Sequence, residues 1–476
     1  MASKVSILLL LTVHLLAAQT FAQELIAWQR QQQQQQQQQL QLQQQLLLQQ
    51  QQHQRNPRPE LGLRSLPGNP WTQNNQEAIS DVVAVDLTKR EPVTPPPNRP
   101  PPVFSYMDRF SSELFKEIIK SQSQQNVVFS PFSVHALLAL IYGASDGKTF
   151  RELQKAGEFS KNAMAVAQDF ESVIKYKKHL EGADLTLATK VYYNRELGGV
   201  NHSYDEYAKF YFSAGTEAVD MQNAKDTAAK INAWVMDTTR NKIRDLVTPT
   251  DVDPQTQALL VNAVYFQGRW EHEFATMDTS PYDFQHTNGR ISKVAMMFND
   301  DVYGLAELPE LGATALELAY KDSATSMLIL LPNETTGLGK MLQQLSRPEF
   351  DLNRVAHRLR RQSVAVRLPK FQFEFEQDMT EPLKNLGVHQ MFTPNSQVTK
   401  LMDQPVRVSK ILQKAYINVG EAGTEASAAS YAKFVPLSLP PKPTEFVANR
   451  PFVFAVRTPS SVLFIGHVEY PTPMSV

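Results

Sequence analysis

The first hundred residues of this chain cannot form a hydrophobic core, which confines any folded domain to the residues that follow. Glutamine dominates residues 31–54, and a proline-rich stretch then ends in the triplets 95–97 and 100–102. Because such a segment buries too little apolar surface to offset its chain entropy, it is typical of a disordered arm with an extended spacer. We predict that residues 23–102 form this arm and that residues 103–476 form the folded domain.

The first 22 residues are typical of a secretory signal peptide. A short basic start is followed by an apolar run and by the small residues of a cleavage pattern, Thr20 and Ala22. His14 interrupts the apolar run, which is also short for a bilayer span, so a membrane anchor is disfavoured. We therefore expect a secreted, extracellular protein. Asn201 and Asn333 each begin an N-x-S/T sequon and are candidate glycosylation sites in that compartment.

The charge balance and the absence of cysteine exclude several classes of function. The 476 residues carry a formal net charge of -1, so there is no global field to attract nucleic acid or an anionic membrane, and we expect neither as a partner. Without cysteine, thiol catalysis, Cys-ligated metals and disulfides are excluded, and core burial alone must hold the domain together. We expect a monomer with no cofactor and no metal ion.

Hydrophobic periodicity predicts both helices and strands in the folded domain. Met107, Phe110, Leu114 and Ile118 recur at helical spacing, and a second helix is predicted over 227–247. Apolar strands are predicted at 258–266, 313–318, 326–331 and 364–375, followed by a final pair at 446–457 and 461–468. Strands outnumber helices in the second half and do not alternate with them, which indicates an α+β fold with large antiparallel sheets.

Residues 420–438, GEAGTEASAASYAKFVPLS, have the alternating pattern of a β-strand, although small and polar residues favour a loop here. At period two, one face would carry only small side chains, those of Thr424, Ala426, Ala428, Ser430 and Ala432. Such a face fits beneath a neighbouring layer without overpacking it. A flexible linker is the alternative, but a linker has no need of a face without large side chains.

This segment resembles the hinge and reactive loop of serpins. The hinge pattern of that family is matched by Glu421, Ala422, Gly423, Thr424 and Glu425, and then by the small residues Ala426, Ser427, Ala428 and Ala429. Other family blocks occur in the same order, among them NVVFSPFSV at 126, NAVYFQGRW at 262, LPKFQFEF at 368 and FVANRPFVFAVR at 446. The resemblance implies a serpin fold with three β-sheets, about nine helices and an exposed C-terminal reactive loop.

The resemblance also implies a mechanism and a reactive bond. In inhibitory serpins the scissile residue lies sixteen positions after the first hinge glutamate, which here implies cleavage between Leu437 and Ser438. A serine protease would form an acyl-enzyme at Leu437, and insertion of the hinge into the main sheet would then distort and trap it. Phe434, Val435 and Pro436 precede the bond, and a leucine at the bond favours a chymotrypsin-like or elastase-like protease with an apolar primary pocket.

A second implied site is a polar cluster beneath the main sheet. Ser130, Ser133 and Asn262 match its members, and Trp270 matches the aromatic residue at the top of the opening. Ordinary core packing is the alternative for each residue alone. Where the family often has a histidine, this chain has Gln413, whose amide can still donate and accept, although a pH dependence carried by the histidine would be lost.

Three further interpretations remain open at this stage. A non-inhibitory serpin, acting as a carrier, a storage protein or a protease substrate, is the main alternative, although this hinge lacks the bulky, charged or proline residues common in that group. A serine hydrolase is disfavoured, because the G-x-S-x-G match around Ser145 follows a helical pattern where a nucleophile elbow requires a strand, and we expect no enzyme. Lys175, Lys177 and Lys178 form a basic cluster that could bind a polyanion or simply be a solvated helix face.

The long N-terminal arm adds an expectation about biological context. A glutamine-rich arm and proline spacer before a Leu-Ser reactive bond look most like the insect haemolymph serpins. That resemblance implies restraint of an extracellular protease cascade of innate immunity, of the Toll or melanisation type.

Overall fold

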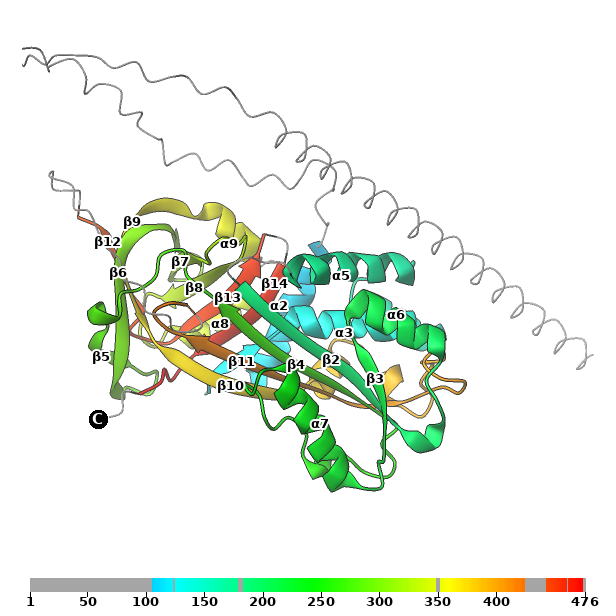
Figure 1. Ribbon diagram of the computed structural model, residues 1–476. Coiled ribbons are helices and arrows are strands. Elements are labelled where there is room, and N and C mark those ends of the chain that lie inside the picture. The colour runs from blue at the N-terminus through cyan, green and yellow to red at the C-terminus, as the bar shows by residue number, and fades with distance from the viewer. Residues whose placement is uncertain are drawn as a thin grey trace, which may run out of the picture. The chain divides into compact units, whose positions relative to one another are not determined.

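The computed structural model describes residues 105–122, 125–178, 183–347, 352–423, 442–459 and 461–473 (Figure 1). Within these ranges the chain is α+β, as predicted. The nine α-helices of this part of the chain are α2 (Ser105–Ser121), α3 (Pro131–Gly143), α4 (Gly147–Ala156), α5 (Ala163–Lys178), α6 (His202–Phe212), α7 (Ala224–Thr238), α8 (Leu338–Leu345), α9 (Leu352–Arg358) and α10 (Thr380–Asn385). None of the described helices is both long and apolar enough to cross a membrane.

A five-stranded sheet carries the candidate site. Its strands, in spatial order, are β10 (Phe371–Asp378), β11 (Val408–Val419), β4 (Ala258–Gly268), β2 (Ala183–Asn194) and β3 (Gly215–Val219). β10 is antiparallel to β11 and β2 is antiparallel to β4, whereas β11 and β4 are parallel neighbours. The sheet therefore has a parallel junction near its centre, between two strands that are far apart in sequence.

Strand β4 is buried on both faces, which explains its continuous apolar sequence. Leu259 and Val261 belong to the same buried cluster as Ile231 of α7, whereas Leu260 and Val264 belong to the main core cluster together with α3. Helices α7 and α3 accordingly contact different strands of this sheet, β2 and β4, and they cover its opposite faces (Figure 1). The α3 side of β4 therefore offers an almost wholly apolar environment to any polar residue placed there.

A nine-stranded sheet forms the rest of the framework. Its order is β1 (Val127–Phe129), β14 (Ser461–Val468), β13 (Phe452–Thr458), β8 (Ser326–Pro332), β7 (Ala313–Ala319), β6 (Ile291–Leu308), β9 (Arg360–Pro369) and β12 (Thr444–Val447), with β5 (Ser280–Gln285) also paired to β6. The 18-residue strand β6 pairs with β5 through its first six residues and with β7 through its last five. Strand β6 thereby connects, through continuous hydrogen bonding, two of the three sheets that the serpin resemblance implies. They form one sheet here.

Helix α3 lies at the centre of the domain and is buried all along its length. Its start follows from local chemistry: the Ser130 side chain accepts a hydrogen bond from the N–H of Ser133, and Pro131 occupies the first helical turn. The same cap places Ser130 and Ser133 at the end of α3 that meets the five-stranded sheet.

Three predicted elements differ from the structure. The strand predicted over 364–375 is divided at Lys370 into β9 and β10, which belong to the nine-stranded and the five-stranded sheet respectively. The strand predicted over 446–457 is divided into β12 and β13, because Pro451 interrupts it and the two halves pair with different partners, β9 and β8. The helix predicted over 227–247 ends at Thr238, because Arg240 and Asn241 adopt positive φ angles of 52° and 61° that terminate it. Ile243 is still buried, although it lies beyond the helix.

Candidate functional site

The candidate site begins at the junction between β11 and β4. The two strands are in parallel register from Ile411 opposite Leu260 to Tyr416 opposite Tyr265, and Gln413 lies opposite Asn262. Asn262 in turn lies opposite Thr189 on β2. A row of polar side chains therefore crosses the middle of an otherwise apolar sheet.

The amide of Gln413 joins the two strands to helix α3. Its Nε2 lies 2.7 Å from Asn262 Oδ1, 2.9 Å from Ser133 Oγ and 3.1 Å from the carbonyl oxygen of Ser130. Its Oε1 accepts a hydrogen bond of 2.9 Å from the N–H of Ser130. Gln413 is 1% exposed, so these contacts replace the water that a buried amide would otherwise need.

Asn262 completes this polar cluster from the β4 side. Its Oδ1 accepts a 2.7 Å hydrogen bond from Ser133 Oγ, and its Nδ2 donates to Thr189 Oγ1 at 2.9 Å. The structure thus brings Ser130, Ser133, Asn262 and Gln413 together, and it adds Thr189, which the sequence did not single out. All five side chains are uncharged at neutral pH, so the cluster links the strands without a titrating group.

The hinge begins directly after β11 and is fixed against the end of β4. The N–H of Trp270 donates to the carbonyl of Ala422 at 3.1 Å, and its indole Nε1–H donates to the carbonyl of Gly420 at 3.0 Å. The indole ring stacks on Tyr320, with ring centroids 4.6 Å apart and an angle of 14° between the planes. Trp270 therefore holds the first hinge residues at the end of the β11–β4 junction.

Glu421 is held by two side chains from other elements. Its carboxylate forms an ion pair of 2.7 Å with Lys370 and accepts a hydrogen bond of 3.1 Å from Thr279. Burial alone would raise the pKa of the Glu421 carboxyl, but the hydrogen bonds from Lys370 and Thr279 and the charge of Lys370 outweigh it and hold that pKa below its usual value. Glu421 is therefore ionised at neutral pH and ties the hinge to the framework.

Gly423 lies directly against the backbone at the end of β4. Its φ of +120° is strained for any residue with a side chain, and a Cβ placed on it would lie 1.9 Å from the carbonyl oxygen of Gly268. Gly420, three residues earlier, has room for a Cβ, with its nearest neighbour at 3.7 Å. The glycine of the hinge pattern is thus required by geometry at position 423.

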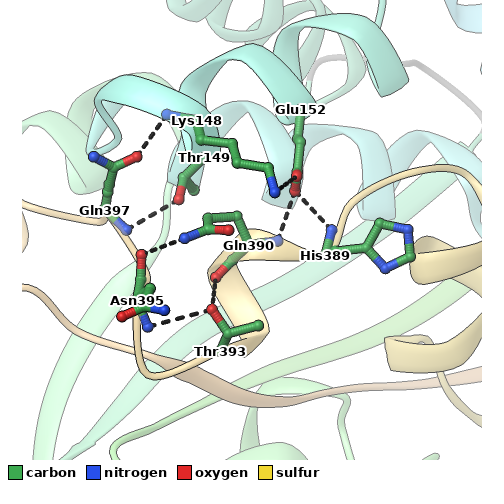
Figure 2. A network of polar contacts seen from close by, with 8 residues as sticks. All are labelled: Lys148, Thr149, Glu152, His389, Gln390, Thr393, Asn395 and Gln397. Atoms are coloured by element: carbon green, nitrogen blue, oxygen red, sulfur yellow. Dashed lines mark hydrogen bonds and ion pairs between the residues drawn. The ribbon is translucent and has the colours of Figure 1, made fainter.

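At the opposite end of β11, the preceding loop is fixed to helix α4 by a network of polar contacts (Figure 2). The carboxylate of Glu152 accepts the N–H groups of His389 at 2.8 Å and Gln390 at 2.6 Å. The side chain of Gln397 accepts from the N–H of Lys148, also in α4. The loop that leads to β11 is therefore fixed to α4.

The remaining candidate residues lie partly outside the described part of the chain. Residues 424–441 are outside it, and with them the hinge from Thr424 onward, the specificity residues Phe434, Val435 and Pro436, and the reactive bond between Leu437 and Ser438. In α5, Lys175 pairs with Glu171 and lies 4.8 Å from the ring centroid of Phe210, so its charge is already engaged. The side chains of Lys177 and Lys178 are outside the described set.

The geometry around Ser145 is not that of a hydrolase nucleophile. Helix α3 immediately precedes it, and Ser145 is fully buried, with its Oγ donating to the carbonyl of Ile141 at 2.7 Å. A nucleophile elbow would instead present the hydroxyl at an exposed turn after a strand. The helical context predicted from the sequence is confirmed.

Both sequon asparagines lie on the surface. Asn201 caps helix α6, where its Oδ1 accepts from the N–H of Ser203 at 3.0 Å. Asn333 follows β8 and is exposed, and its N–H donates to the carbonyl of Gly312 at 2.8 Å. Both side chains are accessible to modification.

The fold and this site define a protein whose main sheet has a parallel junction, secured by buried amides, with a hinge held at the end of that junction. The profile of the family described as "Serpin (serine protease inhibitor)" matches residues 105–471. The chain belongs to the serpin family.

Individual relatives agree with this assignment over nearly their whole length. The chain is 33% identical to Antichymotrypsin-2 of Bombyx mori, over 75% of this chain and 96% of that protein. It is 34% identical to Alaserpin of Manduca sexta, over 76% of this chain and 93% of that protein. Among solved structures, Serpin48 of Tenebrio molitor superposes with a TM-score of 0.71 at 30% identity, covering 77% of this chain and 97% of that one.

Proposed function

We propose that this serpin inhibits a chymotrypsin-like or elastase-like serine protease by trapping it as a covalent acyl complex. The protease serine attacks the carbonyl carbon of Leu437, the bond to the nitrogen of Ser438 breaks, and the leaving amine takes up the proton. The released hinge then enters the main sheet and carries the attached protease with it. A displacement of ~1 Å among the catalytic groups of the protease is enough to slow deacylation by on the order of 100-fold.

The observation that carries this proposal is the parallel pairing of β11 with β4, next to the hinge. A segment that turned back after Gly423 and entered between these strands would run antiparallel to both of them. One parallel ladder would thus be replaced by two antiparallel ladders, which pair slightly more stably per residue. The small side chains at Thr424, Ala426 and Ala428 would share one face of the inserted strand and would fit beneath the layer that covers that face of the sheet.

The contacts around the junction support a sheet that opens at one defined place. Gln413 and Asn262 connect the two strands through side chains, and these bonds must break or rearrange when the strands separate. The network at Glu152 holds the loop that precedes β11 against α4. We propose that β11 keeps its position while β4, β2 and β3 move away from it.

The leucine at the proposed bond sets the class of target. An apolar primary pocket accepts Leu437, whereas a trypsin-like pocket with an acidic residue at its base requires a basic side chain. Antichymotrypsin-2, at 33% identity, has a name that points to the same class of protease for that relative. We extend this to the present chain as part of the proposal.

We further propose that the protein is secreted, is glycosylated at Asn201 and Asn333, and restrains an extracellular protease cascade of innate immunity. The signal-peptide pattern of residues 1–22 and the surface positions of both sequons support the first two points. The third rests on the insect relatives and on the resemblance to haemolymph serpins.

The test is to incubate the secreted protein with chymotrypsin, pancreatic elastase or trypsin and to analyse the products on denaturing gels. We expect an SDS-stable complex with chymotrypsin or elastase and a small released fragment that begins SLPPKPTEF. Clean cleavage without a stable complex would mean a non-inhibitory serpin or a simple substrate. A fragment that begins elsewhere would place the specificity residue at another position.

A further inference from the structure

A cavity of about 160 Å³ lies beside the segment that follows Trp270. Its walls come from that segment, from β6 and β7, and from the end of α9 with the start of β9 (Figure 1). None of the residues that line it belongs to the polar cluster or to the hinge. The cavity is therefore a second candidate site, separate from the trapping machinery proposed above.

Gly304 opens this cavity in the interior of strand β6. Its φ is not positive, and a Cβ placed on it would meet Leu359 at 3.4 Å and Glu317 at 3.5 Å, which is ordinary van der Waals contact. The backbone therefore does not require glycine at this position. A glycine inside a strand often marks the close approach of a ligand, and here its missing side chain adds room to the cavity.

Glu317 of β7 lies opposite Gly304 and also lines the cavity. Its Oε1 accepts a hydrogen bond of 2.7 Å from Ser326 Oγ and pairs with Arg457 at 3.4 Å. Its Oε2 lies 3.6 Å from the Cβ position at Gly304 and has no hydrogen-bond partner among the described residues. The carboxylate is thus held in place through one oxygen, and the other oxygen is left for a ligand.

Two further polar atoms beside the cavity lack a partner. His272 Nδ1 lies 3.1 Å from the carboxylate of Asp301, so the neutral ring donates there and keeps Nε2 as an acceptor. This Nε2 and the hydroxyl of Tyr303 are both buried without a hydrogen-bond partner in the described part of the chain, and the two rings meet edge to face. Because an unpaired buried polar atom is destabilising, a donor that entered the cavity would satisfy both atoms after a small rotation of each ring.

We propose that this cavity binds a small primary amine in its cationic form. An ammonium group has three N–H donors, and the cavity has three matching acceptors in Glu317 Oε2, His272 Nε2 and the Tyr303 oxygen. Among the residues that line the cavity, Glu271 and Glu317 outnumber the one arginine, Arg361, which favours a positive charge over a negative one. The volume admits an apolar body about the size of a benzene ring.

The experiment titrates the full-length protein with benzylamine, in the absence of protease, and follows binding by ligand-observed NMR. Benzyl alcohol and benzoate carry the same ring with a neutral and an anionic head group. We expect benzylamine to bind with a Kd on the order of 1 mM, which ligands of this size can reach. Benzyl alcohol should bind at least about tenfold more weakly, because hydrogen bonds from a charged donor are stronger, and benzoate should not bind.

Two substitutions test where the amine binds, each with a matched control. Tyr303→Phe removes only a hydroxyl without a protein partner, so it should keep the wild-type thermal midpoint but bind benzylamine about tenfold more weakly. Tyr192→Phe removes another such hydroxyl and should bind as wild type does. Gly304→Ala fills part of the cavity and should weaken binding by at least about tenfold, whereas Gly215→Ala, at another strand glycine with ordinary clearance, should not.

Each outcome decides the proposal. Weaker binding of benzylamine in both test variants, with both controls unchanged, supports it. No binding by the wild type at amine concentrations on the order of 10 mM overturns it, because the cavity would then hold only water. Benzoate binding as tight as that of benzylamine, equal weakening in the controls, or unchanged binding in either folded test variant also overturns it. If Gly304→Ala does not fold, the comparison of Tyr303→Phe with Tyr192→Phe decides alone.

Discussion

Gln413 and Asn262 lie directly opposite each other across the junction of β11 and β4, and their side-chain amides are 2.7 Å apart. Each residue is 1% exposed. A buried amide that loses its partners incurs a desolvation penalty of about 1–3 kcal/mol. The two strands are therefore joined by polar side chains at their centre, in addition to the backbone ladder.

The first prediction is that Gln413→Ala destabilises the uncleaved protein by roughly 2–4 kcal/mol, because it leaves Asn262 Oδ1 and both backbone groups of Ser130 short of partners. Thermal and urea unfolding of uncleaved protein measure this loss. Gln377→Ala is the matched control, since Gln377 lies opposite Gln413 on β10 but donates only to the neighbouring carbonyl of Asp378. Equal losses of stability in the two variants would show that the hydrogen bonds of the polar cluster do not stabilise the protein.

A second prediction concerns the close approach of the hinge. Gly423→Ala should lower stability by about 1–3 kcal/mol, because the added Cβ meets the carbonyl of Gly268 and the backbone keeps a positive φ. Gly420→Ala, with ordinary clearance, should be neutral or slightly stabilising through the unfolded chain. Denaturant midpoints of the two variants give the comparison, and identical midpoints would mean that the hinge is not held against β4.

A third prediction is the pH dependence of the hinge contact at Glu421. Its pKa is lowered in the folded protein, so its stabilising effect is complete above the unfolded value of about 4.3 and disappears as the pH falls through the lower folded value. Glu421→Gln should therefore lower the thermal midpoint at neutral pH and match the wild type in acid. Glu381→Gln, which alters an exposed pair with Lys384, should change little at any pH. A constant difference between Glu421→Gln and wild type across this range would contradict the assignment.

The polar cluster could be predicted from sequence only where a short block carried it. Ser130 and Ser133 lie in the segment NVVFSPFSV, and Asn262 starts NAVYFQGRW, so recognition of the blocks identified them. Thr189 contacts Asn262 from 73 residues away, and only the register of β2 on β4 brings the two together. Local sequence around Thr189 shows an ordinary alternating strand.

The contacts of the hinge could likewise be predicted from the sequence only in part. Glu421 and Gly423 were predicted from the local pattern. Lys370 lies in the block LPKFQFEF, but its pairing with Glu421 was not predicted, and Thr279 and Tyr320 come from segments with no local signal. Gly268 was visible in the block around Trp270, but its closeness to Gly423 depends on how β11 ends. Patterns within a segment therefore predicted what each element is, and the tertiary contacts determined which side chains hold the hinge.

A fourth prediction concerns acid sensitivity of the core. His135 lies between Phe110 and Phe159, with ring centroids at 4.2 and 4.9 Å, and burial lowers its pKa to about 3. The His135 side chain takes up a proton near pH 6.5 in the unfolded chain but stays neutral in the folded protein. Its contribution should therefore lower the free energy of unfolding by about 1.4 kcal/mol for each unit that the pH falls between these two pKa values. His135→Gln does not titrate and should flatten this part of the profile. Urea unfolding from pH 7 to pH 4 provides the measurement, and an unchanged slope would exclude His135 as its source.

The last prediction tests the two faces of the proposed inserting strand. Thr424 falls on the small face that would be buried, so Thr424→Arg should block insertion and turn the inhibitor into a substrate. Glu425 falls on the opposite face, so Glu425→Arg adds the same side chain one residue later and should preserve the complex. The fraction of cleaved serpin found in SDS-stable complex with chymotrypsin distinguishes them. Because cleavage precedes insertion, both variants should be cut between Leu437 and Ser438. Undiminished complex with Thr424→Arg would refute insertion in this register, and equal loss in both variants would indicate that charge, not the buried face, controls trapping.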